Sequence, residues 1–175
     1  MADHKNDRAL QVLQSEAITR GDTLETIREK LEFFNKAIHR DPTGPIKTNT
    51  EAGGSKYIPI EELEMMMDEI FMGHWQTKTV GSGAKVVGNS VVYDLEVSFL
   101  HPISGMWITR SGSGAVPIQL KSQRHQGGAR HALDFERINP MAIQKNAPAA
   151  KAYAFRNAVQ SIGRMFGRDL NRDHG

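Results

Sequence analysis

Basic residues in the last third of the chain are the first feature that could do chemistry. Residues 121–175 contain ten Lys or Arg against four Asp or Glu, whereas the first 120 residues have four more acids than bases. Such a concentration of positive charge, on a chain whose net charge is only +2, favours an anionic partner, above all nucleic acid. An ordinary solvated basic face would have the same composition, so charge alone leaves both interpretations open.

Catalytic chemistry has little support in the sequence. The glycines before Lys85 lack the spacing of a nucleotide-binding P-loop, and seven scattered His with no Cys give no zinc-finger pattern or thiol nucleophile. Asp94 and Glu96 on one predicted strand leave a metal-dependent nuclease as an alternative, although Ser98 stands where that chemistry would want Lys. We therefore expect a binding protein with no catalytic residue, no metal and no cofactor.

Two amphipathic helices are predicted in the first half of the chain. The first begins at an Asp22 N-cap with Glu25 as its capping-box partner, and it ends at Asp41-Pro42. Residues 42–56 are rich in Gly and Pro, which predicts a long loop. Apolar residues at helical spacing then predict a second helix from Ile60 to Phe71.

Three antiparallel strands are predicted to follow as a meander. The first runs from Trp75 to Val87 with glycine interruptions, and Gly88-Asn89 supplies a hairpin turn. Residues 91–99 alternate cleanly between apolar and polar, as expected of a strand with one buried face. The third strand, residues 106–118, is rich in Gly, which indicates either a close approach of another chain's backbone or a bulge that bends the sheet.

A long basic helix is predicted to end the fold. Residues 119–146 are expected to form a connection, and residues 147–170 a helix whose first turn holds Pro148. The predicted fold class is α+β, a three-stranded antiparallel meander packed on helices, with this long basic C-terminal helix. Its arginines could line one side of a groove, although ordinary surface arginines would follow the same spacing.

The length of 175 residues predicts one domain. Residues 22–175 are expected to form it, after a flexible or short-helical segment over 1–21. No apolar run approaches the ~18 residues of a membrane span, and no secretory signal is recognisable. We therefore expect a cytoplasmic protein without a membrane partner.

Several short motifs occur in a characteristic order. They are Lys56-Tyr57-Ile58-Pro59, a helix that ends Glu69-Ile70-Phe71-Met72-Gly73-His74-Trp75, the meander, and a late helix with Ala154, Ala158 and Arg164-Met165-Phe166-Gly167. Over about Lys47 to Arg172 the chain resembles the Rad-fifty-two superfamily of single-strand annealing proteins, which includes phage Sak-type recombinases. The resemblance implies ATP-independent binding of single-stranded DNA, annealing of complementary strands in recombination and DNA repair, and assembly into a homo-oligomeric ring.

The resemblance also implies where DNA binds. Lys47 matches a basic residue about ten positions before the motif tyrosine, and Tyr57 matches that tyrosine at the head of the second helix. Ser90 and the Gln160-Ser161 pair stand where the family has basic residues, and its C-terminal extension has no counterpart here, so no recombinase partner is implied. Together with the charge pattern, the predicted DNA-binding residues are Lys47, Lys56, Tyr57, Arg110, Lys145, Lys151, Arg156, Arg164 and Arg168.

A structural or adaptor protein is the competing function. Its basic face would meet an acidic protein surface rather than phosphates. Nucleic-acid affinity falls linearly with salt on logarithmic axes, with one slope for all sequences, so a salt titration separates the two functions.

Overall fold

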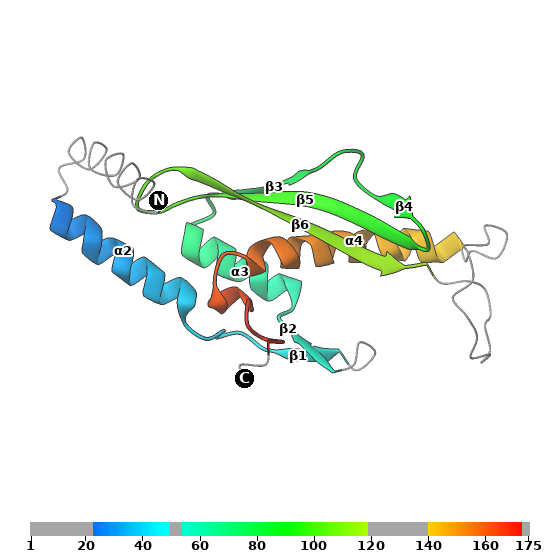
Figure 1. Ribbon diagram of the computed structural model, residues 1–175, viewed down its shortest axis with the longest axis horizontal. Coiled ribbons are helices and arrows are strands. Elements are labelled where there is room, and N and C mark those ends of the chain that lie inside the picture. Colours follow the sequence, from blue (N-terminus) through cyan, green and yellow to red (C-terminus); the bar gives the residue numbers. More distant parts are fainter. Residues whose placement is uncertain (1–22, 50–53, 119–139, 173–175) are drawn as a thin grey trace, which may run out of the picture.

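The fold is given by a computed structural model that describes residues 23–49, 54–118 and 140–172. Helices and antiparallel strands share the chain, so the predicted α+β class is confirmed. In chain order the elements are α2 (Leu24–His39), β1 (Lys47–Asn49), β2 (Ser55–Tyr57), α3 (Ile60–Phe71), β3 (Trp75–Thr79), β4 (Lys85–Val87), β5 (Ser90–Leu100), β6 (Trp107–Pro117), α4 (Pro140–Gln160) and the 3-10 helix η3 (Arg164–Phe166) (Figure 1). Within these three ranges, no helix has the length and apolar character that would let it traverse a bilayer.

β5 is the central strand of a four-stranded sheet. β6 pairs antiparallel with one edge of β5 over eleven consecutive residue pairs. β3 and β4 both pair with the other edge, and Val80 between them still donates its N–H to the carbonyl oxygen of Asp94. Gly88, with a φ of 60°, turns the chain from β4 into β5. The predicted meander is confirmed, with its first strand split in two.

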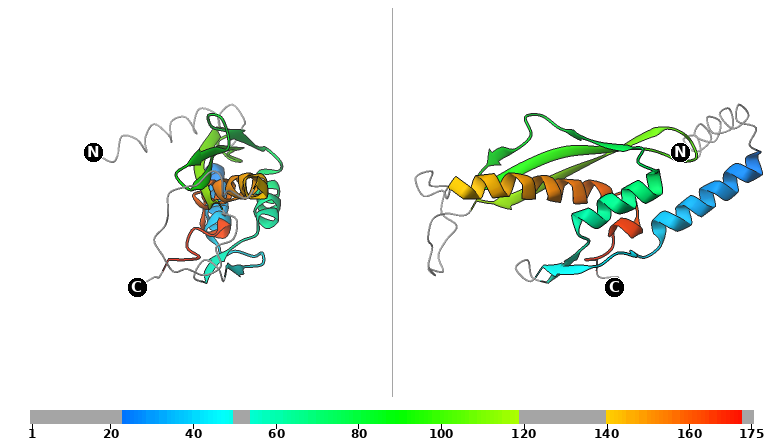
Figure 2. Two further views of the ribbon diagram at one scale, coloured as in Figure 1. Left: turned by 90° about the vertical axis from the view of Figure 1, so that its right-hand side faces the viewer. Right: turned by 180° about the vertical axis from the view of Figure 1, so that it is seen from behind.

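α4 lies along one face of the sheet and touches β6 at the level of the backbone (Figures 1 and 2). A Cβ atom added to Gly112 would lie 2.1 Å from the carbonyl oxygen of Ala154, and one added to Gly114 would lie 2.1 Å from that of Ala150. Ala150, Ala154 and Ala158 are fully buried and four residues apart, so the helix presents its smallest side chains to the strand. The glycines of β6 therefore admit a helix of the same chain.

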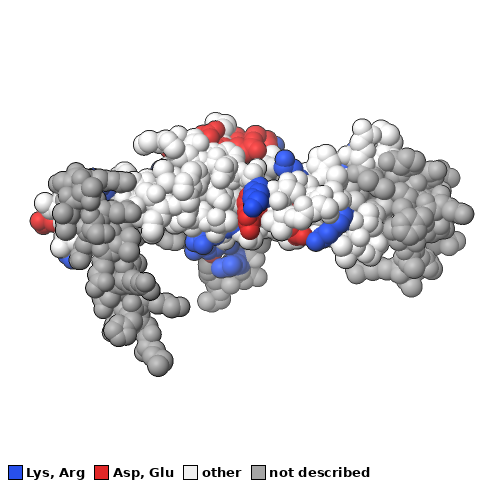
Figure 3. All heavy atoms as spheres, turned by 90° about the horizontal axis from the view of Figure 1, so that it is seen from above, with Lys and Arg blue, Asp and Glu red and all other residues white. Residues whose placement is uncertain are grey.

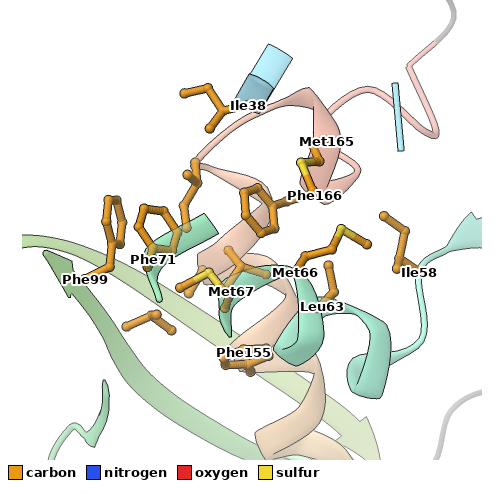
Figure 4. Close-up of a cluster of buried hydrophobic side chains, with 14 of the residues drawn as sticks. Ile38, Ile58, Leu63, Met66, Met67, Phe71, Phe99, Phe155, Met165 and Phe166 are labelled. Carbon is orange, nitrogen blue, oxygen red and sulfur yellow. The ribbon is translucent and has the colours of Figure 1, made fainter. Parts of the chain in front are cut away.

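The hydrophobic core joins α3, α4 and the sheet to η3 near the C-terminus (Figure 4). Phe71 links it to α2 and β5, since its ring centroid lies 6.4 Å from that of Phe34 and 4.3 Å from that of Phe99. The largest fully buried side chains are Ile58, Leu63, Met67, Val91, Leu95, Val97, Val159, Met165 and Phe166. The alternation predicted for β5 is confirmed by its buried residues.

The first helix and the loop after it differ from their predictions. Thr23 is the N-cap of α2, because its Oγ1 accepts a hydrogen bond from the N–H of Thr26 at 3.2 Å. The predicted Asp22 N-cap is therefore wrong, and residues 1–21 lie outside the described part. The predicted loop over 42–56 contains the β1–β2 hairpin, whose three-residue strands are too short to show a periodic pattern.

The last helix begins and ends earlier than predicted. It begins at Pro140, which takes the first-turn place expected for Pro148, and it ends at Gln160 instead of residue 170. A Cβ atom at Gly163 would lie 2.3 Å from the carbonyl oxygen of Ile38, so the chain passes against the end of α2 there in an extended conformation. Residues 140–146, predicted as connection, are helical. The rest of that connection, 119–139, lies outside the described residues.

Candidate nucleic-acid interface

A polar hollow of about 350 Å³ lies where the β1–β2 hairpin, β6, α4 and the C-terminal residues meet. We name it the Arg156 hollow. Its lining within the described chain contains no acidic residue and is rich in hydrogen-bond donors. The lining residues are Asn49, Ser55, Lys56, Tyr57, Gly114, Ala115, Tyr153, Arg156, Asn157, Gln160 and Asn171. This composition suits an anionic ligand.

The side chain of Arg156 is held by two tyrosines. Tyr153 and Arg156 are three residues apart on α4, so they share one face of the helix, and Tyr57 ends strand β2. The guanidinium carbon of Arg156 lies 4.6 Å from the ring centroid of Tyr57 and 5.3 Å from that of Tyr153. Both distances are within the range of a cation–π interaction, which fixes the plane of the guanidinium.

This arginine is partly desolvated, and it forms no ion pair with the described residues. Burial lowers the pKa of Arg156 from its usual value, while Tyr153, Tyr57 and Glu61 act in the opposite direction. Its Nε is buried and finds no hydrogen-bond acceptor among the described residues. An arginine stays protonated in proteins, so Arg156 cannot relieve the cost of burial by losing its proton. An anion in the hollow would offset that cost.

Two predicted lysines belong to the same hairpin. Lys56 is exposed and lines the hollow, directly before Tyr57. Lys47 pairs with Tyr57 in the register of β1 and β2, and its Nζ lies 3.9 Å from Oε1 of Glu61. Both partners of that ion pair are more than half exposed, so it is weak and leaves Lys47 accessible to another anion. The structure thus brings Lys47, Lys56, Tyr57 and Arg156 together.

Of the predicted DNA-binding residues, Lys56, Tyr57 and Arg156 line the hollow, and Lys47 and the others do not. Arg164 pairs with Asp41 at 2.9 Å, and Arg168 donates to the carbonyl oxygen of Ser161. Arg164 begins the 3-10 helix η3, and Arg168 follows that helix, so neither residue continues α4. The predicted row of arginines at helical spacing is therefore wrong. The three remaining predicted residues, all exposed, are Arg110 on β6 and Lys145 and Lys151 on α4.

Charge is spread unevenly over the sheet side of the molecule. Figure 3 shows acidic side chains gathered at one long edge and most basic side chains away from it. The acidic residues of α3 are Glu61, Glu62, Glu64, Asp68 and Glu69, and α3 carries no basic residue. In contrast, α4 carries Lys145, Lys151 and Arg156 with no acidic residue.

Sequence reasoning missed two residues of the hollow that matter for its geometry. Tyr153 was missed although its spacing of three from Arg156 was a usable signal. Asn171 was missed because its contact is with Lys56, 115 residues earlier, and no local pattern indicates such a pair.

The carboxylate of Asp94 belongs to a polar cluster on the sheet. Lys85 Nζ lies 2.6 Å from Asp94 Oδ2, and Ser113 Oγ donates to Asp94 Oδ1. Hydrogen bonds from Lys85 and Ser113 lower the pKa of Asp94. In the ranges that the structure describes, no group of three His, Cys, Asp or Glu could hold a metal ion. The geometry of Asp94 is thus that of a cross-strand ion pair.

The resemblance to single-strand annealing proteins rests on the motifs in the sequence. Of the motif residues, Lys56 and Tyr57 line the hollow, whereas Ala154 and Ala158 are buried in the core. No protein-family model and no curated protein matches this chain.

Proposed function

We propose that this protein binds single-stranded DNA in the Arg156 hollow and anneals complementary strands without a nucleotide. The observation that carries the proposal is the desolvated guanidinium of Arg156 between Tyr57 and Tyr153, in a hollow whose described lining has no acid. Proteins that bind single strands without sequence preference combine cations for the phosphates with aromatic rings for the bases. The hollow offers both within one small surface.

Each group has a distinct part in the proposed binding. Arg156 and Lys56 attract phosphate oxygens, and the amide of Gln160 donates a hydrogen bond beside them, whereas the amide of Asn157 already donates to the carbonyl oxygen of Ser113. Tyr153, which is 37% exposed, offers part of its ring to a base. Contacts of this kind engage the sugar-phosphate backbone and the faces of bases, so the pairing edges stay open to a second strand. This is the property that annealing requires.

We propose further that copies of the chain associate, as the resemblance implies. Within the described residues β6 pairs on one side only, with β5. Asn157 and Asn146 of α4 donate to the carbonyl oxygens of Ser113 and Pro117, and the part of the outer edge before Ser113 offers hydrogen-bonding groups to another chain. Light scattering at micromolar concentration should then give a mass above the 19.5 kDa of one chain. A monomer under those conditions would contradict the proposed ring but leave the DNA-binding hollow untouched. We place the protein in the cytoplasm, of the host if a phage encodes it.

The deciding experiment measures binding and annealing of fluorescent oligonucleotides in EDTA with no nucleotide. We compare the wild type with Arg156→Glu, and with Arg110→Glu as a matched charge reversal outside the hollow. Arg156→Glu should abolish annealing and leave the oligomer intact, whereas Arg110→Glu should retain most of it. The same loss in both variants would point to net charge alone, as expected of a nonspecific basic face.

Salt and metal separate the competing functions. The logarithm of the DNA affinity should fall linearly with the logarithm of the salt concentration, with one slope for all sequences. An adaptor with an acidic protein partner would show no DNA affinity at moderate salt. Cleavage of the oligonucleotide on addition of magnesium would favour the nuclease alternative.

A further inference from the structure

The side chain of Asn171 forms two hydrogen bonds to the backbone of Lys56. Its Oδ1 accepts from the N–H of Lys56 at 2.7 Å, and its Nδ2 donates to the carbonyl oxygen of the same residue at 2.8 Å. Both polar atoms of the amide are therefore engaged. Although Asn171 lines the Arg156 hollow, these bonds to Lys56 leave its amide poorly placed to hold a ligand.

The amide of Asn171 forms hydrogen bonds with the edge of β2 that faces away from β1, as a third strand would. In an extended strand the N–H and C=O of one residue point to the same side, so those of Lys56 point away from β1, towards Asn171. β1 and β2 are only three residues long, and a two-stranded hairpin of that size is marginal by itself. Within the described residues no strand pairs with the outer edge of β2. The two hydrogen bonds of Asn171 are made to this edge.

Asn171 is itself held by a firmly packed segment. Met165 and Phe166 of η3 are fully buried, and they anchor the chain in the core a few residues before Asn171. Gly167 then turns the chain with a φ of 88°, and the N–H of Leu170 bonds to its carbonyl oxygen. The segment from η3 to Asn171 is thus anchored in the core at one end and bonded to the hairpin at the other.

We infer that Asn171 is a positioning residue, which sets the hairpin so that Tyr57 stacks on Arg156 with Lys47 beside Tyr57 on the same face of the hairpin. Tyr57 follows Lys56 directly and Lys47 pairs with Tyr57, so the backbone position of Lys56 governs all three side chains. Arg156 stands on α4 and keeps Tyr153 of the same helix as a partner, so it depends on the hairpin only for its contact with Tyr57. This inference rests on the proposed function for its effect on DNA, but the clamp itself can be tested without DNA.

The first experiment measures hydrogen exchange of the Lys56 amide in the free full-length protein. Asn171→Ala should raise its exchange rate at least tenfold, because the acceptor Oδ1 is lost. Asn35→Ala, an exposed asparagine on α2, is the matched control and should change nothing at Lys56. Unchanged exchange in Asn171→Ala would overturn the inference, whatever the DNA result.

The second experiment is a pair of double-mutant cycles on the affinity for single-stranded DNA. Asn171→Ala alone should weaken binding about fivefold, an order-of-magnitude figure for lost hydrogen bonds. Lys47→Ala should then add less than about twofold in that background, because its hairpin is no longer held, whereas Arg156→Ala should keep most of its effect through Tyr153 on its own helix. Equal losses for Lys47→Ala in both backgrounds would contradict a positioning role.

Further outcomes keep the two proposals apart. If the wild type binds no DNA while Lys56 exchange depends on Asn171, the proposed function fails and the clamp stands. If Asn171→Ala melts too early to be measured, Asn171→Gln replaces it, since its amide is displaced by one methylene but stays polar. Asn171→Gln should keep the melting temperature and lose about threefold in affinity, and wild-type affinity would contradict the inference.

Discussion

The two walls of the Arg156 hollow are built in different ways. On one side α4 lies on β6 so closely that Gly112 and Gly114 leave no room for a methyl group. On the other side the β1–β2 hairpin meets the body through side chains, with the ring of Tyr57 on Arg156 and the amide of Asn171 on Lys56. The first wall belongs to the core, whereas the strands of the second wall lie at its margin and are joined to it at Ile58. Substitutions should therefore act on stability at the first wall and on binding at the second.

The largest effect is expected at the first wall. Gly112→Val places a branched side chain where even a Cβ atom would lie 2.1 Å from the carbonyl oxygen of Ala154. α4 must then leave the strand, and we expect the free energy of unfolding to fall by about 3 kcal/mol or more. Urea denaturation measures this. Ala115→Val, exposed on the same strand, is the control and should stay within about 0.5 kcal/mol of the wild type.

Arg156→Lys tests the contact between the two walls. The substitution keeps the positive charge but loses the planar group that stacks on Tyr57 and Tyr153, so DNA binding should weaken by about 1.5 kcal/mol. Fluorescence anisotropy at fixed salt gives the affinity, and thermal melting reports the fold. Wild-type affinity in Arg156→Lys would mean that charge alone suffices and that the tyrosines only pack.

A smaller effect is expected for Lys47, which lies on the β1–β2 hairpin that forms the second wall. Lys47→Ala removes one exposed cation, so binding should weaken by about 1 kcal/mol and the salt slope should flatten by about one unit. Stability should hardly change, because the ion pair with Glu61 is long and solvent-exposed. An unaltered salt slope would show that Lys47 meets no phosphate.

The smallest effect is expected outside both walls. Arg164→Ala breaks an exposed ion pair with Asp41, and we expect changes below about 0.5 kcal/mol in both stability and DNA affinity. The same titrations and melts measure it. A large loss of affinity would place DNA on the Arg164 side of the molecule and contradict the assignment of the hollow.

Periodic patterns explain which elements the sequence predicts correctly. The alternation of residues 91–99 and the helical spacing from Ile60 to Phe71 are visible because one face of each element is buried. The same reasoning fails after Gln160. Ile162 and Phe166 continue the apolar spacing of α4 and are buried, yet Gly163 is extended there and η3 follows. The pattern therefore predicts burial correctly but not the conformation.

The candidate site is predictable only in part. Lys47 and Tyr57 are predicted from the resemblance, and Arg156 from the resemblance together with its place outside the apolar stripe of a predicted helix. Their meeting depends on tertiary contacts between β2 and α4, which no local pattern encodes. Arg164 and Arg168 were assigned to the groove on the assumption of a helix that ends before them. The spacing argument for these two arginines therefore fails, because it assumes one continuous helix up to residue 170.

The close approach of α4 to β6 also bears on the order of folding. Because α4 packs on the backbone of β6 at Gly112 and Gly114, we expect the β5–β6 hairpin to form before the helix docks on it. The two strands are neighbours in sequence, whereas Gly112 and Ala154 are about forty positions apart, and the longer loop closes at a greater entropic cost. Changes in the turn at Gly105 should accordingly slow folding, and changes on α4 should mainly speed unfolding.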